Sequence, residues 1–566
     1  MSRLSGFSVR TLAIALIAVS PALAQPGAPA ARTLRGGVEP GAPAARTLRG
    51  GVEPGAPAAR TLRGGVEPGV EPGAPVARTS RAGVEQAALA GFDESVAKAV
   101  QEWGATGLAV AVVKDGEVVF SKGYGVREIG KPAKVDAQTL FAIGSTTKAM
   151  TAALVGMLVD EKKLAWDDPV TKHLPWFQLS DPYLTREITV RDLLVHRAGL
   201  GNADYLWYGQ PTDAREILRR ARLLPVSYSL RSSFIYQNVM YAAAGAVIEA
   251  VAGRTWADQM RTRLFEPLGM RDTIATAATL AKQPNVAVPH DLVEGQVQAI
   301  ENAAVDSVAP AGSVWSSVSD MAKWSAMLLN KGKAGERTLL KPETVEELFK
   351  PQTLVTAAAF YPTARLTRPK WTTYGLGWFQ QDYRGRAVDY HTGSIDGMVA
   401  IHGLLRDANV GVFVLGNRDH TEVRHAIMLN VFDRFIGGAP RDWSAELRDL
   451  YEGLQKEADA QRQKVEASRV GGTSPTLALA RYAGTYSDPL RGDVIVSLEG
   501  SRLRARYGGA YVGTLEHWHY DTFRAKWDAA WRGTALATFV LDATGEPSRV
   551  QLMGASFARR AGPASR

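Results

Sequence analysis

The 566-residue chain contains no cysteine. This absence excludes disulfides, thiol nucleophiles and cysteine-ligated zinc, so packing alone has to stabilise the folded chain. The nine histidines are scattered without a His-Glu-x-x-His pair, and the "HWH" of His517 to His519 lies in an expected strand with no evident carboxylate partner. No phosphate loop or dinucleotide fingerprint stands out among the 55 glycines. We therefore expect neither a metal site nor a cofactor.

The chain also carries little net charge after residue 85. Charged residues make up 22% and hydrophobic residues 46%, as in ordinary water-soluble proteins. Of the net charge of +9, +5 lies before Gln86, and the remaining +4 is too little to predict nucleic-acid binding. The expected partner is a small-molecule or short-peptide substrate. The length favours two or three domains, and the sequence does not indicate the oligomeric state.

The first 24 residues have the pattern of a signal peptide. Arg3 and Arg10 precede the apolar run "TLAIALIAVSPALA", which ends in the small-residue motif Ala22-Leu23-Ala24. The run is shorter than the roughly 20 residues that a spanning helix needs, and no cysteine is present for lipid attachment. We expect an exported protein, periplasmic or secreted, without a stable membrane anchor.

A repeat follows the expected signal. The 14-residue unit "GAPAARTLRGGVEP" begins at Gly27, recurs at Gly41 and Gly55, and then decays. A unit this short and this rich in Gly, Pro and Ala cannot bury a core, so residues 25–85 are predicted to be a disordered linker.

The remaining chain divides into three expected parts. Residues 86–440 combine two strand pairs, around Asp115-Gly116 and around Asp407-Ala408-Asn409, with mainly helical segments between them. This pattern predicts an α+β domain in which one antiparallel sheet packs against helices and an inserted helical region. Residues 441–475 are predicted to be a helical connector. Residues 476–566, with short strands between Gly and Asp turns, are predicted to be a small antiparallel β-barrel-like domain.

The pattern Ser-x-x-Lys occurs at "STTK" and again at "ESVAK". Ser145 and Lys148 stand at the start of a predicted apolar helix, where residues three apart share a face and unpaired N–H groups can hold an oxyanion. A buried lysine with a lowered pKa can take the proton of the serine hydroxyl. Ser95 and Lys98 lie instead inside an exposed amphipathic helix, so we expect a surface pair there.

Two later segments complete a recognisable set. "SFIYQNVMY" places Tyr236 and Asn238 in a Tyr-x-Asn arrangement, and "DYHTGSIDG" places His391, Thr392 and Gly393 near a predicted strand. With Ser-x-x-Lys ahead of them, these motifs make the chain resemble the serine β-lactamase and penicillin-recognising superfamily. The resemblance is closest to the class C β-lactamase-like branch that includes esterases and D-aminopeptidases, and it spans roughly residues 87–437. The last 90 residues resemble a domain of unknown function that often follows such domains.

The resemblance implies a role for each motif residue. Ser145 would be the nucleophile that forms an acyl-enzyme, Lys148 would activate it, and Tyr236 would act as general base and then acid, helped by a charged Lys148 that favours its anion. Substrate-binding residues would be Asn238, His391, Thr392, Gly393 and Ser394. The backbone N–H of Ser394 would join that of Ser145 in the oxyanion hole.

The chain departs from β-lactamases at His391, where that branch usually carries lysine. Histidine, with an ordinary pKa near 6.5, offers no permanent charge to a β-lactam carboxylate. We therefore expect a serine hydrolase of small esters or peptide-like amides. A class C-type β-lactamase or D,D-carboxypeptidase is the alternative enzyme, and a ligand-binding or sensor module without turnover is the alternative from another class.

Overall fold

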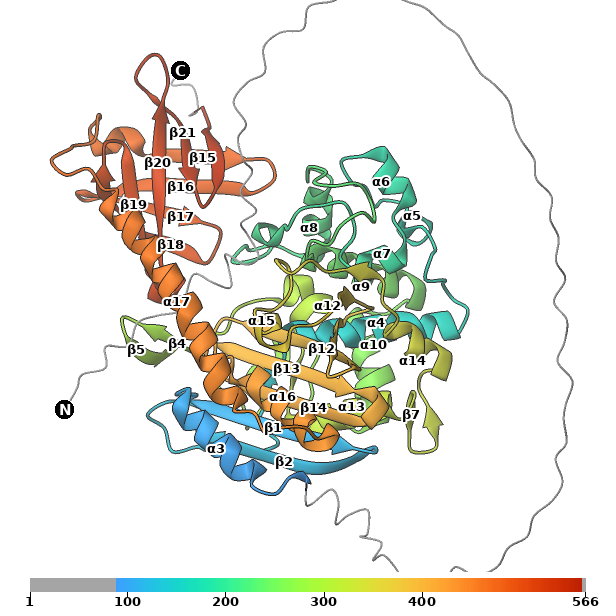
Figure 1. Ribbon diagram of the computed structural model, residues 1–566. Helices are drawn as coiled ribbons and strands as arrows, with labels where there is room; N and C mark the ends of the chain where they lie inside the picture. The colour runs from blue at the N-terminus through green and yellow to red at the C-terminus, as the bar shows by residue number, and fades with distance from the viewer. Residues whose placement is uncertain (1–87, 562–566) are drawn as a thin grey trace, which may run out of the picture.

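The computed structural model describes residues 88–561, which form a large α+β domain, a long helix and a barrel (Figure 1). The expected signal peptide and repeat linker lie outside the described residues. Among residues 88–561, no helix has both the length and the apolar composition needed to cross a bilayer.

An eight-stranded antiparallel sheet organises the large domain, in the order β2-β1-β14-β13-β12-β11-β10-β9. Asp115 and Gly116 both adopt positive φ, 54° and 84°, and form the tight turn between β1 and β2 that the sequence predicts. The first strand then pairs with the last, so that Leu108 lies opposite Gly416. The strands are β1 Gly107–Lys114, β2 Glu117–Gly125, β9 Thr353–Leu354, β10 Thr372–Tyr374, β11 Phe379–Tyr383, β12 Arg386–Ile395, β13 Met398–Leu405 and β14 Val410–Gly416.

Helices cover both faces of this sheet. A side chain at Gly403 of β13 would meet Met428 of α16 (Val423–Ile436), and one at Gly411 of β14 would meet Leu329 of α13 (Val318–Leu329). These two glycines face opposite sides, because Gly403 pairs with Val412, the neighbour of Gly411. Every residue of β13 and β14 is accordingly buried.

The segment between β2 and β9 is mainly helical, as the sequence predicts. Its central element, α4 (Thr147–Asp160), is buried along almost its whole length and packs against α9 (Asn238–Ala252), α12 and α14. The other helices of the described chain are α3 Phe92–Glu102, α5 Val170–His173, α6 Pro182–Glu187, α7 Val190–Leu194, α8 Ala214–Ala221, α10 Trp256–Met260, α11 Glu266–Leu268, α12 Ala309–Gly312, α14 Pro342–Leu348, α15 Ala364–Thr367 and α17 Trp443–Ala467. Short strand pairs are β3 Phe141–Ala142 with β6 Trp315–Ser316, β4 His290–Val293 with β5 Gln296–Ala299, and β7 Lys333–Ala334 with β8 Arg337–Thr338.

The long helix α17 leads from the large domain to a closed barrel of eight antiparallel strands (Figure 1). Aromatic side chains fill the barrel interior, among them Tyr486, Phe523 and Phe557. The strands are β15 Gly484–Asp488, β16 Gly492–Glu499, β17 Arg502–Tyr507, β18 Tyr511–His519, β19 Thr522–Trp527, β20 Thr534–Leu541, β21 Pro547–Leu552 and β22 Ala555–Arg559. The predicted fold class, an antiparallel sheet with helices followed by a small β-barrel, is confirmed.

Candidate active site

Ser145 and Lys148 lie where a short 3-10 turn, η1 (Gly144–Thr146), runs into α4. The Lys148 Nζ is 2.9 Å from the Ser145 Oγ, 2.7 Å from the Asn238 Oδ1 and 2.8 Å from the Ala311 carbonyl oxygen. The side chain of Lys148 has no exposure to solvent, because every residue of α4 from Thr147 to Leu158 is buried.

This environment disfavours the charged form of Lys148. Burial lowers the pKa of the Lys148 amine well below its usual value, and the charge of Asp204 offsets only part of that effect. A neutral amine has two N–H groups, which the Asn238 Oδ1 and the Ala311 carbonyl accept, and one lone pair. The lone pair is then free to accept the proton of the Ser145 hydroxyl, which is the geometry of a general base.

Tyr236 and Asn238 flank the start of α9, and His196 fixes them in place. The His196 Nδ1 accepts a hydrogen bond of 3.0 Å from the backbone N–H of Gln237, and its ring lies 4.3 Å from that of Tyr236, centroid to centroid. His196 itself adopts a positive φ of 59°, an uncommon conformation for this residue. No role for His196 was predicted from the sequence.

The electrostatics of Tyr236 differ from the expectation. Burial raises the pKa of the Tyr236 hydroxyl well above its usual value, and interaction with the Ser145 hydroxyl opposes this rise. The contact with Ser145 is too loose for a well-formed hydrogen bond, and the buried phenol oxygen has no other partner among the described residues. The expected pair of a charged Lys148 and a Tyr236 anion finds no support in the resting site, since burial disfavours the ammonium and the phenolate alike and shifts the two pKa values in opposite directions. Tyr236 is poised as a proton donor.

Two glycines bring the strand after His391 against the nucleophile. A Cβ at Gly144, whose φ is +51°, would lie 2.8 Å from the Ser394 backbone nitrogen. A Cβ at Gly393 would lie 3.1 Å from the Ser145 nitrogen and would collide with the carbonyl of Ile143. The two segments that carry the N–H groups expected to form the oxyanion hole therefore lie directly against each other, and the narrow gap between them leaves no room for a side chain at either glycine.

His391 lies on β12 behind this gap, almost fully buried. Its ring is hydrogen bonded to the Tyr374 hydroxyl at 3.1 Å and to the Thr392 carbonyl at 2.6 Å. Burial lowers its pKa to about 3, so the ring is neutral at physiological pH. Thr392 is bonded through its hydroxyl to Tyr361 at 2.8 Å, whereas Ser394 is exposed.

A buried arginine that the sequence interpretation missed supports the same strand. One nitrogen of the Arg424 guanidinium donates to the Gly393 carbonyl at 2.6 Å, to the Ser394 Oγ at 3.0 Å and to the Ala400 carbonyl at 3.0 Å. Its other nitrogens pair with Glu422, at 3.0 Å each. Arg424 is a positioning residue, because it holds the backbone that carries the Ser394 N–H. Its motif, "EVRH", carries no signal that distinguishes it from a surface pair.

A carboxylate was missed as well. Asp204 accepts from the Asn238 Nδ2 at 2.9 Å, which orients that amide so that its oxygen faces Lys148. The indole of Trp207 donates to the same carboxylate oxygen at 2.8 Å. Ser145, Lys148, Asn238 and Asp204 thus form a continuous hydrogen-bonded series. No group of three or more acidic or histidine side chains in residues 88–561 is arranged to hold a metal ion.

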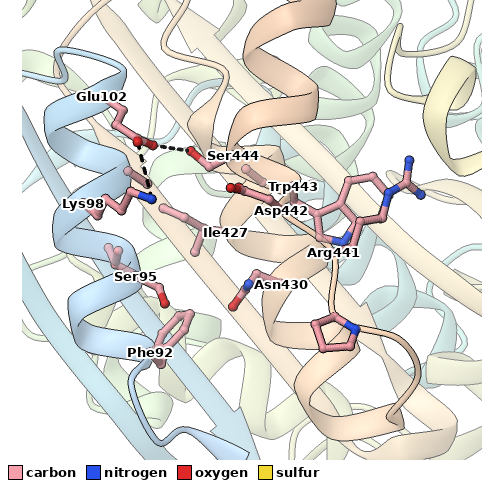
Figure 2. Close-up of a pocket in the computed structure, with 14 residues that line it drawn as sticks. Phe92, Ser95, Lys98, Glu102, Ile427, Asn430, Arg441, Asp442, Trp443 and Ser444 are labelled. Atoms are coloured by element: carbon pink, nitrogen blue, oxygen red, sulfur yellow. Dashed lines mark hydrogen bonds and ion pairs between the residues drawn. The ribbon is translucent and has the colours of Figure 1, made fainter.

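The second Ser-x-x-Lys match has a different setting. Ser95 lies on α3 at the rim of a surface hollow between α3, α16 and the start of α17, where its hydroxyl donates to the Gly91 carbonyl at 2.8 Å (Figure 2). Lys98 points instead to Glu102, at 3.6 Å, and is largely exposed. Without a buried amine on its hydroxyl, Ser95 has no activating base.

Comparison with known proteins agrees with this geometry. The beta-lactamase family model matches residues 92–431, more than half of the chain. The chain belongs to the beta-lactamase family. A second model, a domain of unknown function (DUF3471), matches residues 468–561, which contain the barrel.

Curated relatives of this beta-lactamase family member are hydrolases. The chain is 29% identical to an unguisins hydrolase, UngD, of Aspergillus violaceofuscus over 81% of this chain and 87% of that protein. It is 32% identical to the teichoic acid D-alanine hydrolase of Staphylococcus aureus, over 29% of this chain and 40% of that protein. The chain is a serine hydrolase of this family.

Two solved structures share the fold. An octameric penicillin-binding protein homologue from Pyrococcus abyssi aligns over 83% of this chain and 99% of that chain, with a TM-score of 0.55 and 21% identity. SurE aligns over 85% of this chain and all of that chain, with a TM-score of 0.50 and 22% identity. At these identities the likeness concerns the fold alone.

Proposed function

We propose that the chain is an exported serine hydrolase that forms an acyl-enzyme at Ser145 and cleaves small esters or peptide-like amides. The observation that carries this proposal is the fully buried Lys148 amine, 2.9 Å from the Ser145 Oγ. Export rests on the N-terminal sequence pattern, and acylation at Ser145 rests on the geometry around it.

The chemistry follows from the protonation states of the site. The Ser145 oxygen attacks the substrate carbonyl while its proton passes to the Lys148 lone pair, and the N–H groups of Ser145 and Ser394 hold the oxyanion. Tyr236, neutral at rest, gives its proton to the leaving group, and the Lys148 ammonium returns a proton to Tyr236. Water then cleaves the acyl-enzyme by the same transfers in reverse.

The neutral His391 favours esters and amides over β-lactams as substrates. A ring with a pKa of about 3 supplies no charge for a substrate carboxylate above pH 4, so β-lactamase or D,D-carboxypeptidase activity is the less favoured alternative. The staphylococcal relative is named as a D-alanine hydrolase, which supports substrates whose acyl group contains a D-residue. Purified protein should hydrolyse nitrophenyl esters and leave a chromogenic cephalosporin intact, whereas the reverse preference would overturn this assignment.

A serine-reactive fluorophosphonate probe with peptide mapping tests the nucleophile. We expect labelling at Ser145, loss of labelling in Ser145→Ala, and unchanged labelling in Ser95→Ala, which alters the other Ser-x-x-Lys match. Labelling at any other serine would refute the mechanism. Intact-mass analysis during ester turnover separates a hydrolase from a binding or sensor module, because only the module would keep its acyl adduct after the substrate is exhausted.

A further inference from the structure

The C-terminal barrel contacts the large domain next to the active site through three of its loops. The guanidinium of Arg532, in the short turn η8 (Ala530–Arg532), donates to the Tyr208 hydroxyl at 3.1 Å and lies 3.4 Å from the Asp396 carboxylate. The Tyr208 hydroxyl donates to the same Asp396 at 2.6 Å. We call Tyr208, Asp396 and Arg532 the interdomain clasp.

The clasp holds two segments that belong to the active site. Asp396 lies two residues after Ser394, in the turn between β12 and β13. Tyr208 lies four residues after Asp204, in the loop of residues 202–210. Arg532 and Asp396 are shielded from solvent, with 11% and 17% of their side chains exposed, so their attraction is screened less than that of a surface pair.

Other barrel contacts secure the same loop. The Gly209 carbonyl accepts backbone hydrogen bonds from Gly509 at 2.8 Å and Ala510 at 3.2 Å. The guanidinium of Arg491 stacks on the ring of Tyr205 at 4.2 Å. The barrel thus contacts the loop of residues 202–210 at three residues, Tyr205, Tyr208 and Gly209.

The other end of the loop is bound to the catalytic motif. The Asn202 Nδ2 donates to the Tyr236 carbonyl at 3.2 Å, and Asp204 accepts from the Asn238 Nδ2 at 2.9 Å. A displacement of the loop would therefore remove one hydrogen bond from each residue of the Tyr-x-Asn motif. The contacts of the motif with His196 and Lys148 would remain.

We propose that the barrel is a positioning element of the active site and that Arg532, through the interdomain clasp, keeps loop 202–210 against Tyr236 and Asn238. This proposal rests on the proposed acylation at Ser145. Arg532 is a positioning residue, since it contacts neither Ser145 nor Lys148.

The test uses the full-length protein and the rate at which a fluorophosphonate probe phosphonylates Ser145, with loss of fluoride. Arg532→Met and Tyr208→Phe should each lower that rate about 10- to 100-fold, as expected for misplaced catalytic groups. Arg532→Lys, which keeps the charge but not the fork of donors, should restore part of it. The control is Arg504→Met, because Arg504 pairs with Asp528 within the barrel at 2.6 Å. The probe should label Ser145 of this control variant at the wild-type rate.

A second readout separates positioning from partial unfolding. The charge of Asp204 raises the pKa of Lys148, so release of the loop should move the acid limb of the pH–rate profile to lower pH. Unfolding would reduce only the amplitude. Faster amide exchange in residues 202–210 should accompany the shift.

Wild-type labelling rates and an unmoved acid limb in both clasp variants would overturn the proposal while leaving Ser145 as nucleophile. Labelling that survives Ser145→Ala would instead overturn the proposed function.

Discussion

Gly144→Ala is the sharpest test of the oxyanion hole, because it adds one methyl group at a known place. The new Cβ would lie 2.8 Å from the Ser394 nitrogen, inside any normal contact distance, and would cover one of the two expected N–H donors. Loss of one such donor lowers kcat by about 10²- to 10³-fold. The φ of +51° at this position adds a left-handed strain of about 1–2 kcal/mol to the folded state.

Gly335→Ala is the matched control. Gly335 has a similar φ, +57°, in the turn between β7 and β8, with open space around the added Cβ. In urea titrations Gly335→Ala should lose only the unfolding free energy of the left-handed strain, and Gly144→Ala should lose more, because its Cβ also meets backbone atoms. Only Gly144→Ala should lose ester hydrolysis under saturating substrate. If Gly144→Ala turned over nitrophenyl esters at the wild-type rate, the gap between Gly144 and Ser394 would not be the oxyanion hole.

Three further changes probe the electrostatics. Because burial lowers the pKa of Lys148, the unfolded chain binds more protons than the folded chain between that pKa and 10.5. The free energy of unfolding therefore rises with pH in this range, by up to about 1.4 kcal/mol per pH unit. Lys148→Met should flatten this slope in urea titrations and abolish acylation. With its pKa at about 3, His391 should contribute no limb to a pH–rate profile between pH 5 and 9, so His391→Gln should leave the shape of that profile unchanged; a lost limb near pH 6.5 would contradict this. Arg424→Met strands the buried Glu422 and should cost about 3–5 kcal/mol of unfolding free energy, more than the double variant with Glu422→Gln, as calorimetry or urea titration can measure.

The sequence was sufficient for the parts of the site that local patterns specify. Ser145 and Lys148 are three residues apart on one helix, so their contact follows from helical geometry. The turn residues at Asp115-Gly116 and Asp407-Ala408-Asn409 predict the strands on each side of them. Tyr236 and His391 were accessible through the family motif order, which carries information that a single local pattern lacks.

The supporting residues could not be found in this way. Asp204 lies 34 residues before Asn238, and Arg424 lies 31 residues after Gly393, the motif residues that they contact. Nothing local marks either one among the many charged residues of the chain. Protonation states were equally hidden, because the pKa values of Lys148 and Tyr236 depend on burial by segments distant in sequence. Burial disfavours the expected tyrosinate for that reason.

The pairing of the first strand with the last has a consequence for how the enzyme is made. Leu108 of β1 finds its partner Gly416 only after some 300 further residues have been synthesised, and Ser145 meets the Ser394 N–H only when β12 is in place. Such long-range closure makes folding slow and leaves hydrophobic strands exposed until late. A nascent chain that already carries its nucleophile is therefore catalytically silent, and hydrolysis begins only when the domain is nearly complete.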